Sequence, residues 1–324
     1  MNNFRNYLED LAQKAKGAGE KEHDSETKLT ITDLRDGNQW KKEWDQGTRW
    51  SNINKGTGTE YWAAEDAARI ICKGIEGWMA NFEEKESPEE WVSSQNCTPE
   101  RMGVYGGQRD SNKCPYKPEI ESWRHYGSGR VLHPGRKEDR TFIVCIDLVA
   151  IMLTVYQNIA KKEGNWVAYN QGKDICQVLY ESYFYWGGRE TARRIMKFWF
   201  GNSTTLELAE GRSVELGETP THSWGKLIGN LPTLVKGIQC NEERSTHDKY
   251  STTCVWLRNE SGCQLLEDQD WENTKKKWDE QLEERKQEWT QNLQEIEKND
   301  VELQKDGEQT RLQAIIRGVT GGGV

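Results

Sequence analysis

The chain lacks several features that would assign it to a common functional class. Among its 324 residues there is no Cys-x-x-Cys pair, so zinc ribbons and dithiol redox motifs are not supported. The net charge is −9 and no stripe of Lys and Arg alternates with aromatic residues, so we expect no nucleic-acid partner. The most apolar run, Phe142 to Tyr156, carries Asp147 and is shorter than the roughly 20 residues that span a bilayer. We therefore expect a buried helix there and no membrane span.

Features of secreted and catalytic proteins are also missing. Met1 is followed by polar and charged residues without the apolar segment of a secretory signal, so any export needs another route. None of the histidines lies four residues from a second ligand on a strong helix, so we predict no metal site. No nucleophile elbow appears, and the irregular cluster Gly103, Gly106 and Gly107 has no preceding strand. We predict no enzymatic activity, no catalytic residues and no cofactor; a divergent hydrolase is the weakest alternative.

Aromatic residues are abundant where aliphatic residues are sparse. The chain has 15 Trp, 11 Tyr and 6 Phe, while charged residues make up 30%. Each aromatic ring buries roughly 150–250 Å² in a core, so a polar sequence of this kind still folds. We expect a small, aromatic-rich core.

Apolar residues at three- and four-residue spacing predict most of the helices. Phe4, Tyr7, Leu8 and Leu11 indicate an amphipathic helix within residues 1–16. A second runs from Tyr61 to Phe82, and Trp40 and Trp44 suggest a short helix between them.

The central part of the chain is predicted to hold the core helix and two partners. Thr141 to Ala160 is apolar on nearly every face, as expected of a helix surrounded by others. Helices over Asp174–Trp186 and Glu190–Phe200 are separated by Gly187 and Gly188.

Loops are predicted where proline, glycine and polar residues collect. Residues 83–138 hold most of the prolines and form a long loop-rich insertion, which is uncommon in a compact domain unless it is tied down. Residues 201–221 read as a polar loop, and His222 to Gly237 as a helix broken at Pro232.

The carboxy-terminal segment predicts one long charged helix. From Asp268 to about Asp306 there is neither Pro nor Gly, and Leu282, Trp289, Ile296 and Leu303 recur every seven residues. The companion positions are polar, so a two-stranded coiled coil is weakly specified. Either this helix lies along its own domain, or the four residues form a seam for a partner helix or for self-association.

The cysteines are the candidate structural residues. Some lie on predicted helices and others in predicted loops, which suits disulfides that pin loops to helices. The alternative is small buried thiols in a reducing compartment. Cys254 and Cys263 form the easiest local loop, but the pattern selects no set of pairs. The candidate disulfide residues are Cys72, Cys97, Cys114, Cys145, Cys176, Cys240, Cys254 and Cys263.

Three glycosylation sequons, at Asn96, Asn202 and Asn259, lie in predicted loops. They matter only in a secretory route, and a chain of this length carries about one or two by chance. We do not base localisation on them.

The order of motifs resembles one known family. An amphipathic helix with Cys72-Lys73-Gly74-Ile75 follows Trp62, and after a cysteine-containing loop Ile143-Val144-Cys145-Ile146 opens an apolar helix. This order, over about residues 1–180, resembles the schizont-infected-cell agglutination variant antigens of simian malaria parasites. The many tryptophans and the charged carboxy-terminal helix depart from that family's pattern. The resemblance implies display on the infected cell surface, immune exposure and adhesion, with no catalytic residues.

We therefore predict an all-α fold: a cysteine-containing helical bundle around a buried central helix. Residues 1–60 would form an amino-terminal helix and a polar Trp-containing segment, 61–263 the bundle, and 264–324 the charged helix with a Gly-rich tail. The first functional hypothesis is an exported variant surface antigen or adhesion domain that binds a host receptor or antibody. The second is an intracellular, cytoplasmic scaffold whose last helix binds a partner or a second copy.

Overall fold

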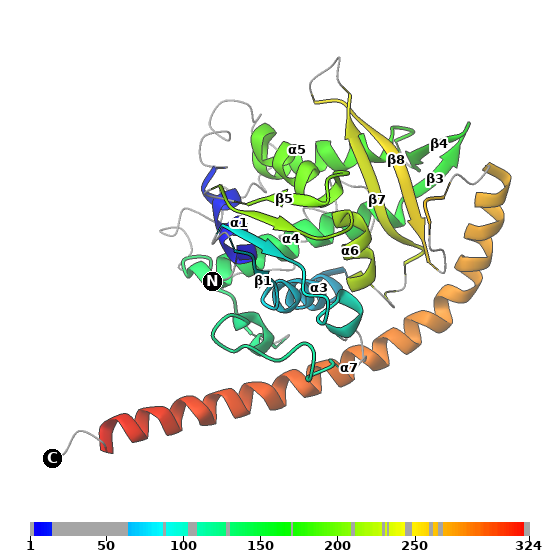
Figure 1. Ribbon diagram of the computed structural model, residues 1–324. Coiled ribbons are helices and arrows are strands. Elements are labelled where there is room, and N and C mark those ends of the chain that lie inside the picture. The colour runs from blue at the N-terminus through cyan, green and yellow to red at the C-terminus, as the bar shows by residue number, and fades with distance from the viewer. Residues whose placement is uncertain are drawn as a thin grey trace.

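The computed structural model shows a mixed α and β protein that combines a helical core with three small sheets (Figure 1). The all-α prediction is therefore wrong. The structure describes residues 3–14, 64–86, 89–102, 109–127, 130–169, 171–208, 211–228, 231, 233–243, 248–258, 262–264 and 268–320. The short helix predicted around Trp40 and Trp44 lies outside these residues.

Helix α4 (Lys137–Gln157) is the centre of the molecule, as its apolar sequence predicts. All its residues from Thr141 to Tyr156 are buried. The acidic residue in this apolar run, Asp147, accepts a hydrogen bond from the indole Nε1 of Trp186 at 2.9 Å. A buried carboxylate needs such a partner, because its desolvation is otherwise costly.

Three further helices pack on α4. They are α1 (Asn3–Lys14), α3 (Ala64–Met79) and α5 (Ile175–Ile195). The phenol of Tyr183 on α5 donates a hydrogen bond to the carbonyl of Leu148 on α4 at 3.0 Å. The periodic patterns therefore located these helices correctly, with their buried faces toward one another.

The predicted break at Gly187 and Gly188 is present inside α5. Gly188 has φ +79° and ψ 173°, a backbone conformation that is essentially restricted to glycine. The helix resumes after it and ends in a π-helical turn, η5 (Met196–Phe200), whose apolar residues are buried. The break thus turns an aromatic-rich segment into the core.

Strands occupy several segments that were predicted to be loops. A four-stranded sheet has the order β1-β2-β6-β5, with β1 (Glu83–Glu84) antiparallel to β2 (Glu90–Val92). Strand β2 then pairs in parallel with β6 (Ser213–Glu215), which is antiparallel to β5 (Thr205–Glu207). With two or three residues each, these strands are too short to show a period-two pattern.

Two antiparallel hairpins complete the strands. The first is β3 (Ile159–Lys162) with β4 (Asn165–Ala168), and the second is β7 (Val235–Glu242) with β8 (Tyr250–Leu257). Strand β3 begins directly after α4, and strands β7 and β8 lie among cysteines and polar residues. For these reasons the sequence patterns did not predict the hairpins.

The helix predicted over His222–Gly237 is only partly correct. Helix α6 runs over Pro220–Ile228, and by Val235 the chain has entered β7. The hydroxyl of Thr221 on α6 donates to the carbonyl of Ile238 at 2.6 Å. A Cβ at Gly237 would lie 2.5 Å from the Thr221 Cγ2 atom, so glycine permits this close packing.

The insertion over residues 83–138 also contains two short 3-10 helices. They are η3 (Pro99–Met102) and η4 (Ser122–His125). Trp123 in η4 is fully buried and tilts against Phe142 of α4, with ring centroids 5.0 Å apart. Trp123 therefore anchors the insertion to the central helix.

Helix α7 (Asp268–Thr320) lies across one side of the molecule. It begins beside the β3–β4 hairpin, passes η4 and continues past the body toward the C-terminus (Figure 1). Trp271 packs edge-on against Trp166 of β4. The buried core is rich in aromatic residues, as predicted, and its largest fully buried side chains include Trp78, Trp123, Trp199, Trp224 and Trp271.

Candidate interaction surfaces

All eight cysteines are joined in disulfides. Cys72–Cys145 links α3 to α4, and Cys176–Cys240 links the first turn of α5 to β7. Cys97–Cys114 closes a loop of the insertion, and Cys254–Cys263 ties the segment after β8 back to that strand. Cys263 is exposed, whereas the other cysteines are buried. The disulfides therefore hold helices, loops and strands in one body.

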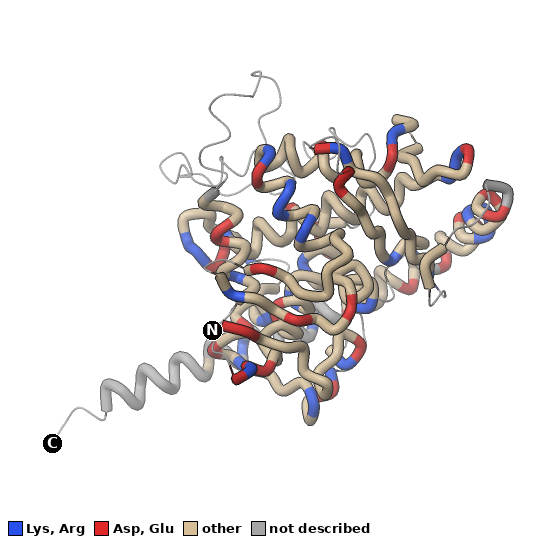
Figure 2. Tube along the Cα trace, turned by 45° about the horizontal axis from the view of Figure 1, so that its top comes forward, with Lys and Arg blue, Asp and Glu red and all other residues tan. Residues whose placement is uncertain are grey.

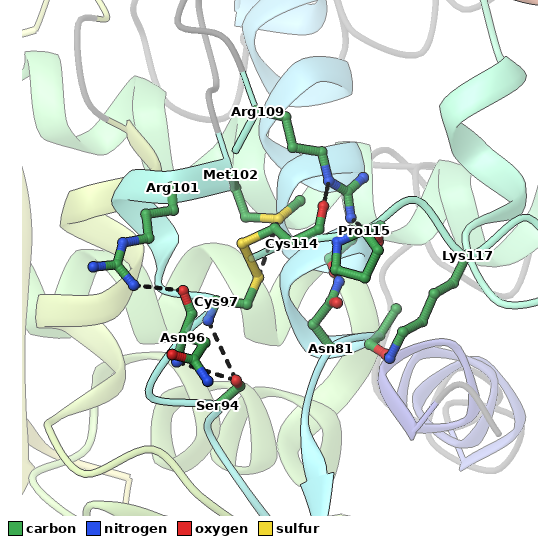
Figure 3. The surroundings of a disulfide bond; sticks show 12 residues. Asn81, Ser94, Asn96, Cys97, Arg101, Met102, Arg109, Cys114, Pro115 and Lys117 are labelled. Atoms are coloured by element: carbon green, nitrogen blue, oxygen red, sulfur yellow. Dashed lines mark hydrogen bonds between the residues drawn. A yellow bond between two sulfur atoms is a disulfide. The ribbon is translucent and has the colours of Figure 1, made fainter. Parts of the chain in front are cut away.

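Hydrogen bonds reinforce the loop that Cys97–Cys114 closes (Figure 3). Arg101 donates from Nη1 to the carbonyl oxygen of Asn96 at 2.7 Å. Arg109 donates to the carbonyl oxygens of Cys114 and of the following proline. The disulfide and these bonds supply the attachment that so long an insertion needs.

A buried ion-pair cluster lies beneath this loop. Arg109 binds Glu121 through both ends of its guanidinium, with Nη1–Oε2 and Nη2–Oε1 distances of 2.7 and 2.5 Å. On α3, Glu76 accepts from the backbone N–H of Trp123 at 2.9 Å and pairs with Arg5 of α1 at 3.3 Å. Burial raises the pKa of Glu76 to about 8, and the positive charge of Arg5 opposes that shift. These acids face partners in the fold, so their arrangement suits anchoring rather than contact with a substrate.

A third buried acid, Asp139, holds the last part of the insertion in place. Asp139, fully buried in the first turn of α4, accepts from the hydroxyl of Tyr126 at 2.7 Å and from the backbone N–H of His133 at 3.0 Å. The guanidinium of Arg130 lies 3.9 Å above the ring of Tyr126. Burial and the neighbouring carboxylate raise the pKa of Tyr126.

The described part of the insertion is therefore attached to the body on its inner side and exposed on its outer side. Gln95, Asn96, Lys113, Glu119 and Val131 are exposed residues of this outer side. A set of exposed side chains on a fixed scaffold is typical of recognition loops.

The predicted seam on α7 is used, over its first half, within the same chain. Of the predicted seam residues, Trp289 is 2% exposed and Leu282 is half-buried; Trp278, which lies on α7 outside the predicted seam, is 9% exposed. The guanidinium of Arg258 lies 5.3 Å from the ring of Trp278. The side chains of the two remaining seam residues, Ile296 and Leu303, are outside the described residues, although the helical backbone there is described.

Two tyrosines that no sequence pattern marked are exposed on the surface. Tyr169, just after β4, and Tyr185, on α5, are 74% and 59% exposed. Near them Lys173 and Glu181 form an ion pair of 2.9 Å. Tyrosine is common in binding hot spots, but neither residue belongs to a sequence motif that would have marked it.

Two of the three predicted glycosylation sequons lie at the surface of the described structure. Asn96 and Asn202 are exposed, and Asn259 lies outside the described residues. The His125 ring contacts the hydroxyl of Tyr116.

Among the described residues no group of His, Cys, Asp and Glu side chains is placed to hold a metal ion, and no helix is both long and apolar enough to cross a membrane. Acidic and basic residues are interspersed along the trace (Figure 2).

Comparison with protein-family models, with curated proteins and with solved structures gives no match to this chain.

Proposed function

We propose that this chain is a non-enzymatic interaction domain that works in an oxidising location. In this proposal it is a variant surface antigen or adhesion domain on the infected host cell, and its partner is a host receptor or an antibody. The observation that carries the proposal is the pairing of all eight cysteines. Structural disulfides persist in oxidising compartments and are rare in reducing ones.

The outer side of the insertion is the proposed recognition surface. Its inner side is held by Cys97–Cys114, by the pair Arg109–Glu121 and by Trp123. Outer residues such as Lys113 and Glu119 can therefore change without loss of the core, which is what antigenic variation requires.

A thiol count tests the proposed location. Protein from its native cell is alkylated during lysis, with and without prior reduction, and its intact mass is measured. We expect almost no alkylation before reduction and eight alkyl groups after it. Eight alkylated thiols before reduction would contradict the proposal.

A binding experiment tests the recognition surface. Lys113→Ser with Glu119→Ser should weaken binding of antibodies raised against the folded chain, while the disulfides stay intact. The control is Glu272→Ser, which changes an exposed residue of α7. Equal antibody binding by both variants would argue against the insertion as the recognised face.

A second candidate function is a scaffold that uses α7 to bind a partner or a second copy. The observation in its favour is that α7 continues past the body (Figure 1). Because Trp289 is buried against the body, polar substitutions there would disturb folding itself. Ile296→Gln with Leu303→Gln is the better test: concentration-dependent association should disappear in the variant and persist in the parent chain. Association that survives the double substitution would exclude this seam.

A further inference from the structure

Helix α1 packs against the described part of residues 64–264, here called the body, although a long stretch of sequence separates the two. It ends at Lys14, and the next element that the structure describes, α3, begins at Ala64. Its apolar residues Phe4, Tyr7, Leu8 and Leu11 are nevertheless at most 1% exposed. The body therefore supplies a complete apolar groove for one face of this helix.

Aromatic rings line the groove. Tyr7 stacks on Phe198 of the π-helical turn η5, with ring centroids 3.9 Å apart. Phe4 lies edge-on against Trp123 of η4 at 6.1 Å, and also contacts Trp199 at 6.3 Å. The rings belong to segments distant in sequence, so the groove exists only in the folded body.

Charged pairs on three body helices add specificity. Arg5 pairs with Glu76 of α3, Glu9 with Arg140 of α4 and Asp10 with Arg194 of α5. The acids Glu9 and Asp10 of α1 thus meet positive charges in the groove, while Arg5 meets the Glu76 carboxyl group, whose charge depends on pH. This pattern of apolar anchors and flanking charges is how grooves recognise amphipathic helices, and it defines the direction in which α1 lies.

We propose that this groove is an exchange site, which accepts α1 from a second copy of the chain as well as from its own. About 50 residues separate α1 from α3, and a chain segment can span at most about 3.3–3.6 Å per residue, so it is long enough to reach a neighbouring copy. Reciprocal exchange gives a closed two-fold dimer in which each α1 makes the same contacts with its groove as in the single chain. The proposal goes beyond the proposed function and does not depend on where the chain acts.

Matched charge reversals test the exchange. In a full-length Asp10→Arg chain, and equally in a full-length Arg194→Asp chain, like charges face each other when α1 docks on its own body. When the two variants are mixed, exchange places opposite charges together at both grooves of a mixed dimer. The chain with both substitutions restores the match within one copy and is the control.

Native mass spectrometry of an isotope-labelled mixture measures the result. We expect the mixed dimer to exceed the dimers of either variant alone by about tenfold, the effect of roughly 1.4 kcal/mol. We expect the control chain to resemble the parent. A mixture that contains no more dimer than its separate components, while circular dichroism shows both folded, would overturn the proposal.

A second pair keeps the test decisive if Asp10→Arg or Arg194→Asp does not fold. Glu9→Lys and Arg140→Glu reverse the pair in which the Arg140 Nη2 and Glu9 Oε1 atoms lie 2.6 Å apart. The same excess of mixed dimer supports exchange, and its absence in folded protein overturns it.

Discussion

Trp271, in the first turn of α7, meets Trp166 of strand β4 edge to face, with ring centroids 5.1 Å apart at an interplanar angle of 84°. The ammonium group of Lys161 lies 4.4 Å from the centroid of the same Trp166 ring. Trp166 thus contacts both a cation and a second indole, and its edge-to-face contact with Trp271 attaches the start of α7 to the body.

Removal of this attachment should release the first turns of α7. Trp271→Ala deletes a side chain that is 2% exposed, and such changes typically cost about 3–5 kcal/mol. We expect faster proteolysis within α7 and a lower urea midpoint. Glu272→Ala, at the exposed neighbouring position, should leave both unchanged. Equal proteolysis of the two variants would mean that the contact between Trp271 and Trp166 does not hold the helix.

The four disulfides should differ in their resistance to reduction. Cys263 is exposed, while the cysteines of the other three pairs are buried. Because a thiolate must reach a sulfur atom to attack it, Cys254–Cys263 should be reduced first. Graded treatment with a dithiol, alkylation and peptide mapping will give the order. Earlier labelling of Cys72 or Cys145 would contradict this prediction.

Glu76 should make stability depend on pH. Burial raises its folded-state pKa to about 8, from the ordinary glutamate value of 4.5. Between these values the folded chain binds more protons at this site than the unfolded chain does, so the contribution to stability falls as the pH rises. The slope for one fully linked site is about 1.4 kcal/mol per pH unit.

Urea unfolding at pH 5, 6, 7 and 8 will measure this dependence. The Glu76→Gln variant cannot titrate at this position, so its stability should fall less over the same range than that of the parent. The difference between the two slopes separates the contribution of Glu76 from the contributions of all other titrating groups. Identical slopes would assign the pH dependence to other residues.

Gly188 should tolerate no side chain. At φ +79° and ψ 173°, any other residue is strained by roughly 1–3 kcal/mol. Gly188→Ala should therefore lower the melting temperature. Gly135→Ala is the control, because a Cβ there meets no atom within 4 Å. If Gly188→Ala melts like its control, the bend in α5 does not depend on glycine.

Local patterns in the sequence determined the principal helices. The spacing of Phe4, Tyr7, Leu8 and Leu11 and the apolar run around Val144 identify α1 and α4, because helix periodicity is visible within a few turns. The break at Gly188 is equally local, since it depends on the conformational freedom of one residue. The presence of eight cysteines and many tryptophans also follows from the sequence alone.

Tertiary structure decided the pairings. Strand β2 finds β6 more than a hundred residues later, as in the register Trp91 with Val214, and no local pattern encodes that choice. One set of disulfides is realised among the 105 connectivities that eight cysteines allow, because folding brings only certain sulfur atoms together. The groove for α1 likewise combines Glu76, Arg140 and Arg194 from three helices. Such sites depend on contacts between distant segments, which only the folded chain brings together.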